Sequence, residues 1–292
     1  MENQNQIIIV AATDNFYAIL LAALIKSIEV THTSGEPIEF YIIDDGISEK
    51  NRQMIVGSAN PDLFTLHWQK SKNVVPKDVK IPTDKSAFPI TTYMRLFAPY
   101  IIPATATKMI YLDVDMILMK DISDLWSVNL EGHIFAAVQD LCEIVGSDWG
   151  GIPNYKELGI DPASKYFNAG LLLVDPIQWR AQDISNKVIT AINVNMDSVN
   201  FADQYGLNVV LHGQWLELDR RWNTFSILNV EDPFLVHFLD IKPIFKSYNT
   251  NKTYYDAFYK YLRLTPYKSF KPVSDYKRLF RKVMIKLGKM FK

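Results

Sequence analysis

Short apolar runs rich in β-branched residues alternate with helical segments along the first half of the chain, and this alternation restricts the possible folds more than any other feature. The runs stand at residues 7–12, 39–43, 64–68, 108–112 and 134–138, with helices predicted at 16–29 and 47–57, the second capped by Ser48. A continuous apolar run of this length is typical of a strand buried on both faces. The order therefore predicts an α/β fold with a mostly parallel central sheet and helices on both faces.

The second half of the chain continues with a different spacing. Strands are predicted at residues 170–174, 215–219 and 234–238, and helices at 176–192 and 203–211. Two prolines bracket residues 266–272, which we interpret as a boundary. We therefore divide the chain into a globular domain at 1–265 and a tail at 266–292.

Composition and charge exclude several classes of protein. Hydrophobic residues make up 48% of the chain, too many for a disordered protein, and a single cysteine, Cys142, leaves no intrachain disulfide or zinc ribbon. We expect a cytoplasmic protein without a secretory signal or a transmembrane helix, because no apolar run approaches the roughly twenty residues of a membrane span. Residues 1–275 carry 24 basic and 32 acidic side chains, a balance that argues against nucleic-acid binding.

The tail has the opposite character. Residues 276–292 contain seven basic side chains and no acidic one. Between them stand apolar residues at helical spacing, namely Tyr276, Leu279, Phe280, Val283, Met284, Leu287 and Met290. The pattern predicts a short basic amphipathic helix that lies on an anionic membrane surface. The alternative is a solvated helix docked on the acidic body.

Acidic side chains gather at the predicted strand ends, where ligands bind in parallel α/β sheets. The most informative are Asp113 and Asp115, which lie between the apolar runs 109–112 and 116–118. Charges in such a stretch are costly unless they are paired or bind a metal. Residues i and i+2 share one face of a strand, so we expect both carboxylates to reach one divalent cation. The alternative is a structural pair held by salt bridges.

Two reaction classes use paired aspartates of this kind. In haloacid-dehalogenase-type phosphatases the first carboxylate is the nucleophile and the second is the general acid. Those enzymes normally carry Thr or Val where this chain has Ile117, and their motif normally stands near the N-terminus. In nucleotide-sugar transferases the pair instead holds a metal on the diphosphate, which stabilises the leaving group.

Several motifs in a fixed order carry a resemblance to a known family. They are Val10-Ala11-Ala12-Thr13-Asp14-Asn15, Ile90-Thr91-Thr92-Tyr93-Met94-Arg95-Leu96, Tyr111-Leu112-Asp113-Val114-Asp115, Phe167-Asn168-Ala169-Gly170, Asp203-Gln204 with Leu207-Asn208, and Val236-His237-Phe238 with Lys242-Pro243. Across about residues 7–243 the chain resembles glycosyltransferase family 8, which contains bacterial lipopolysaccharide α-galactosyltransferases and α-glucosyltransferases and the glycogenins. The resemblance implies a GT-A fold with a Rossmann-like sheet in a catalytic domain at 1–265, a UDP-sugar donor, Mn²⁺ (or Mg²⁺), and retention of the anomeric configuration.

The resemblance also implies roles at the donor site. Asp113 and Asp115 would hold the metal with His237 as a third ligand, although a lone histidine is often a core residue. Arg95, the only cation in its apolar stretch, would lie by the diphosphate or the sugar, or in a salt bridge to Asp113 or another carboxylate of the site. Lys242 would contact the diphosphate, but the family's glycine between His237 and Lys242 is missing and the segment is one residue shorter.

Two further groups of residues complete the implied site. Ala11, Thr13 and Asn15 would contact the uracil and ribose at the end of the first strand, the alternative being an ordinary helix entry. The hydroxyls of the transferred sugar would bond four side chains, those of Asp140, Asn168, Asp203 and Gln204. Because glutamine is a poor nucleophile, Gln204 favours departure and attack on one face of the sugar. A covalent route would need Asp203 or Asp140.

The sequence therefore predicts a retaining hexosyltransferase that moves galactose or glucose from a UDP-sugar to a lipopolysaccharide or another surface-glycan acceptor. It would work in the cytoplasm, at the inner face of the cell membrane. Two alternatives stay open: a metal-dependent phosphatase of haloacid-dehalogenase type, and a non-catalytic sugar-nucleotide-binding protein.

Overall fold

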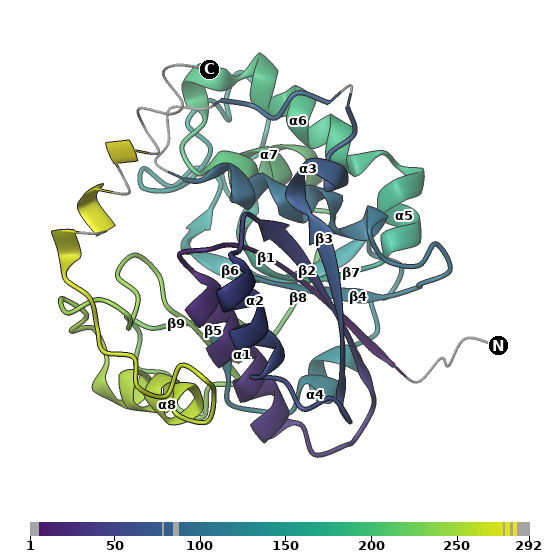
Figure 1. The fold of residues 1–292 in the computed structure, drawn as a ribbon. Helices are drawn as coiled ribbons and strands as arrows, with labels where there is room; N and C mark the ends of the chain where they lie inside the picture. The colour runs from purple at the N-terminus through teal and green to yellow at the C-terminus, as the bar shows by residue number, and fades with distance from the viewer. Residues whose placement is uncertain (1–5, 78, 84–87, 277, 281–282, 285–292) are drawn as a thin grey trace.

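The fold is built on two sheets (Figure 1). A computed structural model describes residues 6–77, 79–83, 88–276, 278–280 and 283–284 of the chain. The strands are β1 (Ile7–Asp14), β2 (Ile38–Asp45), β3 (Phe64–Lys70), β4 (Met109–Leu112), β5 (Met116–Leu118), β6 (Phe135–Ile144), β7 (Lys165–Val174), β8 (Leu216–Glu217), β9 (Thr224–Phe225) and β10 (Leu235–His237). Within that part of the chain, a seven-stranded sheet has the order β3-β2-β1-β4-β7-β6-β8 and a three-stranded sheet has the order β5-β10-β9.

The central sheet is mostly parallel, as the sequence predicts. β3, β2, β1 and β4 run parallel to one another, and β8 runs parallel to β6. β7 is the exception, since it lies antiparallel to both β4 and β6. The parallel part of the sheet thus ends at β4, next to the antiparallel strand β7. The ends of these strands bring together most of the candidate site residues.

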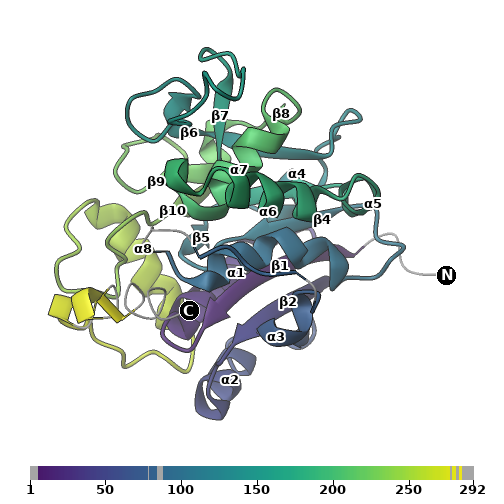
Figure 2. The same cartoon turned by 90° about the horizontal axis from the view of Figure 1, so that it is seen from above.

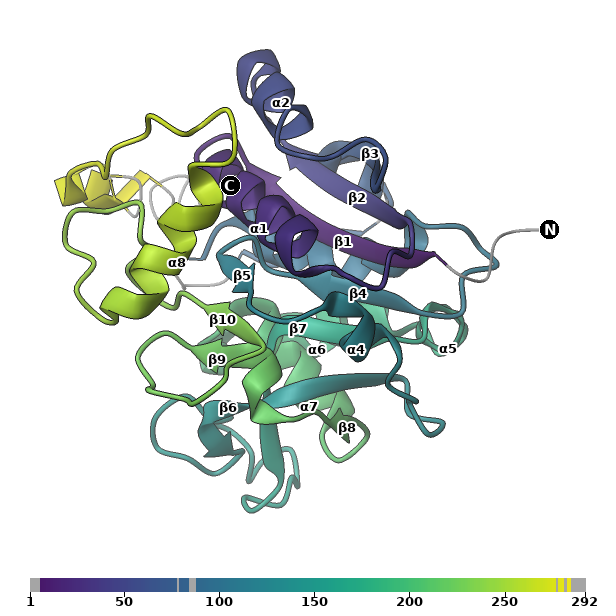
Figure 3. The ribbon, with the colours of Figure 1, turned by 90° about the horizontal axis from the view of Figure 1, so that it is seen from below.

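Helices cover both faces of the central sheet. They are α1 (Ala18–Thr31), α2 (Glu49–Val56), α3 (Ser71–Val74), α4 (Ile122–Trp126), α5 (Pro176–Ala181), α6 (Ile184–Val194), α7 (Ala202–Leu211) and α8 (Lys252–Leu262), with 3₁₀ helices η1 (Ile90–Tyr100), η2 (Met196–Ser198) and η3 (Arg220–Asn223). Figure 2 views the layer that contains α5, α6 and α7, and Figure 3 views the opposite layer with α1, α4 and α8.

Strand β1 is buried on both faces because its alternate side chains enter two different cores. Ile7, Ile9 and Ala11 pack with α1, α2 and α8, whereas Ile8 and Val10 pack with η1, α6 and α7. This division explains why the strand reads as a continuous apolar run instead of an alternating one. The predicted α/β fold with helices on both faces is therefore confirmed.

Several predicted elements have different limits in the structure, and two of the differences are large. The helix predicted at 176–192 is two helices, α5 and α6, because Asp183 between them has a left-handed backbone with φ of 52°. Aspartate tolerates this conformation, and its short polar side chain makes such a break possible. The strand predicted at 170–174 starts at Lys165, so that Asn168 lies within β7 and not in a loop before it.

The start of the tail packs against the body. Val273 forms a parallel bridge with Phe245, and the Ser247 hydroxyl bonds the Asp275 carboxylate. Backbone at 275–276, 278–280 and 283–284 is helical, and Tyr276 and Phe280 are exposed. Most of the predicted basic side chains, and Leu287 and Met290, lie outside the described residues, so the division at residue 265 and the amphipathic helix stay predictions. Among the described residues, no helix has the length and apolar character needed to cross a membrane.

Candidate functional site

The two aspartates of the Asp-Val-Asp motif lie on a connection between two sheets. Asp113, Val114 and Asp115 join β4 of the central sheet to β5 of the small sheet, so the prediction that both aspartates share one face of a strand is wrong. Backbone bonds hold this connection at both ends, from Asp113 N to Gly170 O (2.8 Å) and from Phe238 N to Asp115 O (2.9 Å). The chain therefore turns here, and the turn presents both carboxylates to the end of β10.

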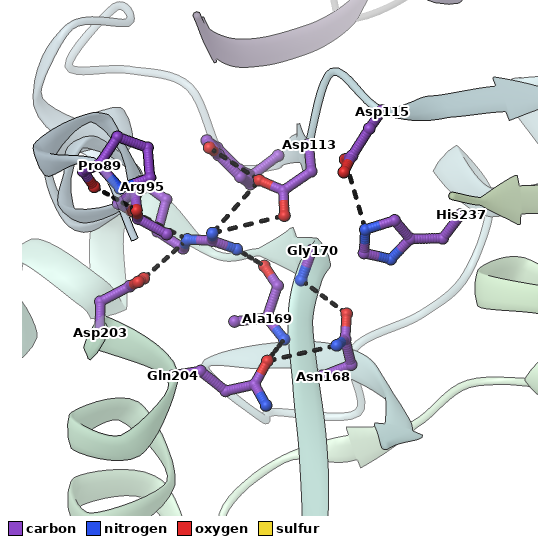
Figure 4. A network of polar contacts seen from close by, with 12 residues as sticks. Pro89, Arg95, Asp113, Asp115, Asn168, Ala169, Gly170, Asp203, Gln204 and His237 are labelled. Carbon is purple, nitrogen blue, oxygen red and sulfur yellow. Dashed lines mark hydrogen bonds and ion pairs between the residues drawn. The ribbon is translucent and has the colours of Figure 1, made fainter. Parts of the chain in front are cut away.

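Asp113, Asp115 and His237 form a compact group of ligand atoms. One atom from each lies within 4.8 Å of the others, and the Nε2 atom of His237 lies 3.4 Å from Oδ1 of Asp115 (Figure 4). The histidine is buried at 3% exposure, and both aspartates are half-buried. Two carboxylate oxygens and one imidazole nitrogen are ligands that suit Mn²⁺ or Mg²⁺ better than a soft metal. The donor set fits a divalent cation.

The two carboxylates of this group differ in their electrostatic surroundings. Burial and the neighbouring charge of Asp115 raise the pKa of Asp113, although Arg95 opposes that rise. Burial also disfavours the Asp115 carboxylate, but Lys242 and His237 outweigh it and hold the pKa of Asp115 well below its usual range. A like charge beside Asp113 and the Lys242 cation beside Asp115 are the main physical causes of this contrast.

Arg95 joins the group of acids to the neighbouring helix. Its Nε atom lies 2.7 Å from Oδ2 of Asp203 on α7, and its NH2 atom lies 3.2 Å from Oδ1 of Asp113. A third bond runs from NH1 to the carbonyl oxygen of Ala169, and the guanidinium lies over the ring of Tyr111. Burial lowers the pKa of Arg95, but the charges of Asp113 and Asp203 outweigh it and hold the pKa above its usual value. The predicted internal salt bridge to Asp113 is present.

The other three residues predicted to bind the sugar meet beside Arg95. Asn168 donates from Nδ2 to Asp140 Oδ2 (2.7 Å), and Gln204 donates from Nε2 to the same oxygen (3.2 Å). The Gln204 Oε1 atom accepts from the backbone N–H of Ala169 at 3.0 Å. β6, β7 and α7 thus each supply one side chain to this cluster, which Figure 4 shows in part below Arg95.

Lys242 forms an ion pair with Asp115, one of the two aspartates predicted to bind the metal. Its Nζ atom is 2.5 Å from Oδ2 of Asp115 and also bonds the carbonyl oxygen of Phe238. The segment between His237 and Lys242 lacks the glycine typical of the family, and here Asp240 adopts the left-handed backbone, with φ of 51°. Aspartate is among the few residues that occupy this region readily. The shorter loop therefore reverses direction at Asp240 and still brings Lys242 to the site.

The residues predicted to contact the base lie at the carboxyl end of β1. Ala11 and Thr13 are buried, and Thr13 pairs in register with Asp44 of β2. The Oδ1 atom of Asn15 accepts hydrogen bonds from the N–H of Ser48 and from Asn51, each at 2.8 Å. Asn15 thus anchors the start of α2, and its predicted contact with the base stays a prediction.

Two further residues of this site had no role predicted from the sequence. Asn223, at the end of η3, is 1% exposed and bonds both His237 and Asn168. A Cβ atom at Gly170 would lie 2.7 Å from His237 Cε1 and 2.9 Å from Asn168 Oδ1, so only glycine fits there without displacement. Gly170 belongs to the Phe167-Asn168-Ala169-Gly170 motif, so the sequence did mark its position. Asn223 belongs to none of the motifs, and only the fold brings it to the site.

Comparisons with known proteins identify relatives of this chain. The chain is 28% identical over 285 residues to General stress protein A of Bacillus subtilis (strain 168), covering 89% of this chain and 94% of that protein. It is 27% identical over 201 residues to Lipopolysaccharide 1,2-glucosyltransferase of Escherichia coli (strain K12), covering 66% of this chain and 55% of that protein.

The fold is shared with a solved structure and with a family. A crystal structure of galactosyltransferase LgtC in complex with donor and acceptor sugar analogs superposes with a TM-score of 0.71 at 24% identity, covering 93% of this chain and 99% of that one. This likeness concerns the fold, which is therefore of the GT-A type. The sequence model of Glycosyl transferase family 8 matches residues 8–269, and the chain belongs to this family.

Proposed function

We propose that the chain is a retaining hexosyltransferase that uses a UDP-sugar and Mn²⁺, with Mg²⁺ as the alternative metal. The observation that carries the proposal is the meeting of two side-chain groups. The Asp113, Asp115 and His237 ligands lie on one side of Arg95, and the Asp203 carboxylate lies on the other. A metal-binding group beside a cluster of sugar-binding polar groups is what transfer from a nucleotide diphosphate requires.

The donor would bind across the ends of β1, β4 and β10. Asp113, Asp115 and His237 would hold the metal, which when bound neutralises charge on the departing diphosphate. Lys242 and Arg95 would add positive charge beside that diphosphate. Ala11, Thr13 and Asn15 at the end of β1 would contact the uracil and ribose, since base and phosphates bind at the carboxyl ends of parallel strands.

The transferred hexose would bond Asp140, Asn168, Asp203 and Gln204. The Asp203 carboxylate is ion-paired with Arg95, and the Asp140 carboxylate accepts from Asn168 and Gln204. These bonds stabilise both carboxylates and make each a weaker nucleophile. Attack by the acceptor on the face that the diphosphate leaves is the route we favour over a covalent glycosyl-enzyme. Galactose and glucose are the two candidate sugars.

The acceptor we propose is a lipopolysaccharide or another surface glycan. The glucosyltransferase of Escherichia coli named above acts, by its name, on lipopolysaccharide. In the tail, Tyr276, Leu279 and Phe280 expose 74%, 53% and 56% of their surface, which suits contact with an anionic membrane at its cytoplasmic side. The acidic balance of residues 1–275 gives no support for nucleic-acid binding.

The two alternatives make different predictions. A phosphatase would hydrolyse phosphomonoesters and have no affinity for UDP, whereas a non-catalytic protein would bind UDP without turnover. Membership of a glycosyltransferase family favours transfer over both.

Thermal unfolding with Mn²⁺, UDP, or both together tests the proposal. A ligand bound only by the folded protein, at about 100 times its Kd, adds roughly 2.7 kcal/mol of stability. We expect a large stabilisation that needs both ligands and that is absent in Asp115→Asn. Asp256→Asn is the matched control, because it removes an exposed ion-paired carboxylate on α8. The absence of any UDP effect in the wild type would refute the proposal. Turnover of UDP-glucose and UDP-galactose, with the product anomer read by NMR, then tests donor and retention.

A further inference from the structure

Asn223 stands between the two halves of the site. It ends η3, its side chain is buried, and its Nδ2 atom lies 2.9 Å from Oδ1 of Asn168. On its other side, Oδ1 lies 3.0 Å from Nδ1 of His237. One amide group therefore touches a proposed metal ligand and a proposed sugar-binding residue at the same time.

The orientation of the Asn168 amide is determined by two partners with only one possible role each. The backbone N–H of Gly170 can only donate, and it lies 2.9 Å from Oδ1 of Asn168. The Asp140 carboxylate accepts, and its Oδ2 atom lies 2.7 Å from Nδ2 of Asn168. Both contacts give the same assignment, so the oxygen of Asn168 is the atom that faces Asn223.

This orientation passes along the chain of hydrogen bonds to the histidine. Because Asn223 faces an oxygen of Asn168, it must present its NH₂ group there and its own oxygen to His237. An oxygen acceptor at 3.0 Å requires that Nδ1 of His237 carry the proton. In the neutral imidazole the lone pair is then on Nε2, the atom that lies 3.4 Å from the Asp115 carboxylate.

We propose that Asn223 is a positioning residue, which fixes the tautomer and ring orientation of His237 and the amide orientation of Asn168 through one directed chain of hydrogen bonds. The roles of His237 and Asn168 rest on the proposed function. An outer partner that bonds the second nitrogen of a metal-binding histidine typically changes metal affinity when it is removed. Here the same partner also holds a sugar-binding residue, so the metal and sugar halves of the site share one support.

Two substitutions separate the two contacts. Asn223→Leu keeps the branched shape of the side chain and loses both hydrogen bonds. Asn223→Asp still accepts from His237, but its carboxylate cannot donate to Asn168 and faces the oxygen of that amide. Asn195→Leu is the control, because Asn195 is a half-buried residue whose amide bonds another amide, that of Asn154, away from this site.

The first measurement reads the histidine tautomer in metal-free protein labelled with ¹⁵N-histidine, at about pH 8, where an unperturbed imidazole is neutral. Two-bond ¹H–¹⁵N spectra identify the protonated nitrogen, and His237→Gln assigns the signal. We expect the Nδ1–H form in the wild type, in Asn223→Asp and in Asn195→Leu, and its loss in Asn223→Leu. An Nε2–H form in the wild type, or an unchanged Asn223→Leu spectrum, overturns the inference.

The second measurement follows free Mn²⁺ by electron paramagnetic resonance in the presence of UDP. Asn223→Leu should weaken Mn²⁺ binding about 10- to 100-fold, the usual range for such an outer partner. Asn223→Asp should keep near wild-type Mn²⁺ affinity and lose the preference for UDP-hexose over UDP. Equal Mn²⁺ affinity in all variants contradicts the inference. If Asn223→Leu does not fold, the tautomer in the wild type and the Mn²⁺ and UDP-hexose binding of Asn223→Asp test the inference instead. A wild type that binds neither Mn²⁺ nor UDP refutes the proposed function, while the tautomer still tests the inference.

Discussion

Removal of Arg95 is the perturbation with the largest expected effect on stability. The Arg95 side chain has 4% of its surface exposed. Its guanidinium lies 2.7 Å from the Asp203 carboxylate and 3.2 Å from the Asp113 carboxylate. In Arg95→Met, the hydrocarbon stem is largely kept, but the buried Asp203 carboxylate and the half-buried Asp113 carboxylate lose their cation. Breaking a buried pair in this way typically costs about 3–5 kcal/mol. The entropy of unfolding at Tm is about 2.1 cal/mol/K per residue. For a chain of this length, a stability loss of about 4 kcal/mol therefore corresponds to a fall of about 6–7 °C in Tm.

Urea unfolding of a double-mutant cycle separates lost charge pairing from lost packing. If the cost comes from unpaired buried charge, Asp203→Asn should recover part of the stability lost in Arg95→Met, so the double variant should be more stable than Arg95→Met alone. A coupling of about 0.5–3 kcal/mol is the range expected for residues in one network. A loss below about 1 kcal/mol in Arg95→Met would refute the reasoning, as would strictly additive effects of the two substitutions.

Three further predictions concern other parts of the chain. The Asp121 carboxylate accepts several backbone N–H bonds, which hold its pKa far below the unfolded value of about 3.9, so its contribution is present above that pH and is lost below it. Urea titrations from about pH 7 to 3 should show Asp121→Asn destabilised most at neutral pH, with the difference shrinking in acid. In Gly206→Ala, a Cβ would lie 2.6 Å from Ile192 Cγ1, and the overpacking, typically about 1–3 kcal/mol, should outweigh the gain of up to about 1 kcal/mol in helix propensity. The same Cβ would lie 2.7 Å from Ile192 Cδ1, the atom that Ile192→Val removes. Adding this second substitution should therefore restore part of that loss in the same urea assay, and failure to do so would contradict a steric cause. Deletion of residues 276–292 should abolish sedimentation with phosphatidylglycerol vesicles and leave the UDP-dependent rise in Tm intact, whereas continued sedimentation would exclude the tail as the membrane contact.

The fold class could be read from the sequence because each strand and helix carries a local signal. β1 is a continuous apolar run since both of its faces are buried, and Ser48 caps α2 as predicted, accepting from Asn51 N. The break at Asp183 could not be predicted, because it depends on a single left-handed residue within an otherwise helical pattern.

The sequence by itself determined the chemistry available at the site. The Asp113-Val114-Asp115 motif predicted a pair of hard metal ligands, the family resemblance added His237 as a third, and Arg95 in an apolar stretch predicted an anionic partner. The predictions for the two aspartates and Arg95 needed only residue types and their neighbours, since a charge among apolar residues must find a partner wherever the chain goes.

Only the tertiary structure decided how those groups meet. The two aspartates converge through a turn between two sheets and not along one strand, and Asp240 takes the left-handed position in the loop that brings Lys242 to Asp115. Asn223 bonds His237, 14 positions later in the sequence, and Asn168, 55 positions earlier. No local pattern marks such a residue, because the direction of a hydrogen bond is fixed by partners that are adjacent only after the chain has folded.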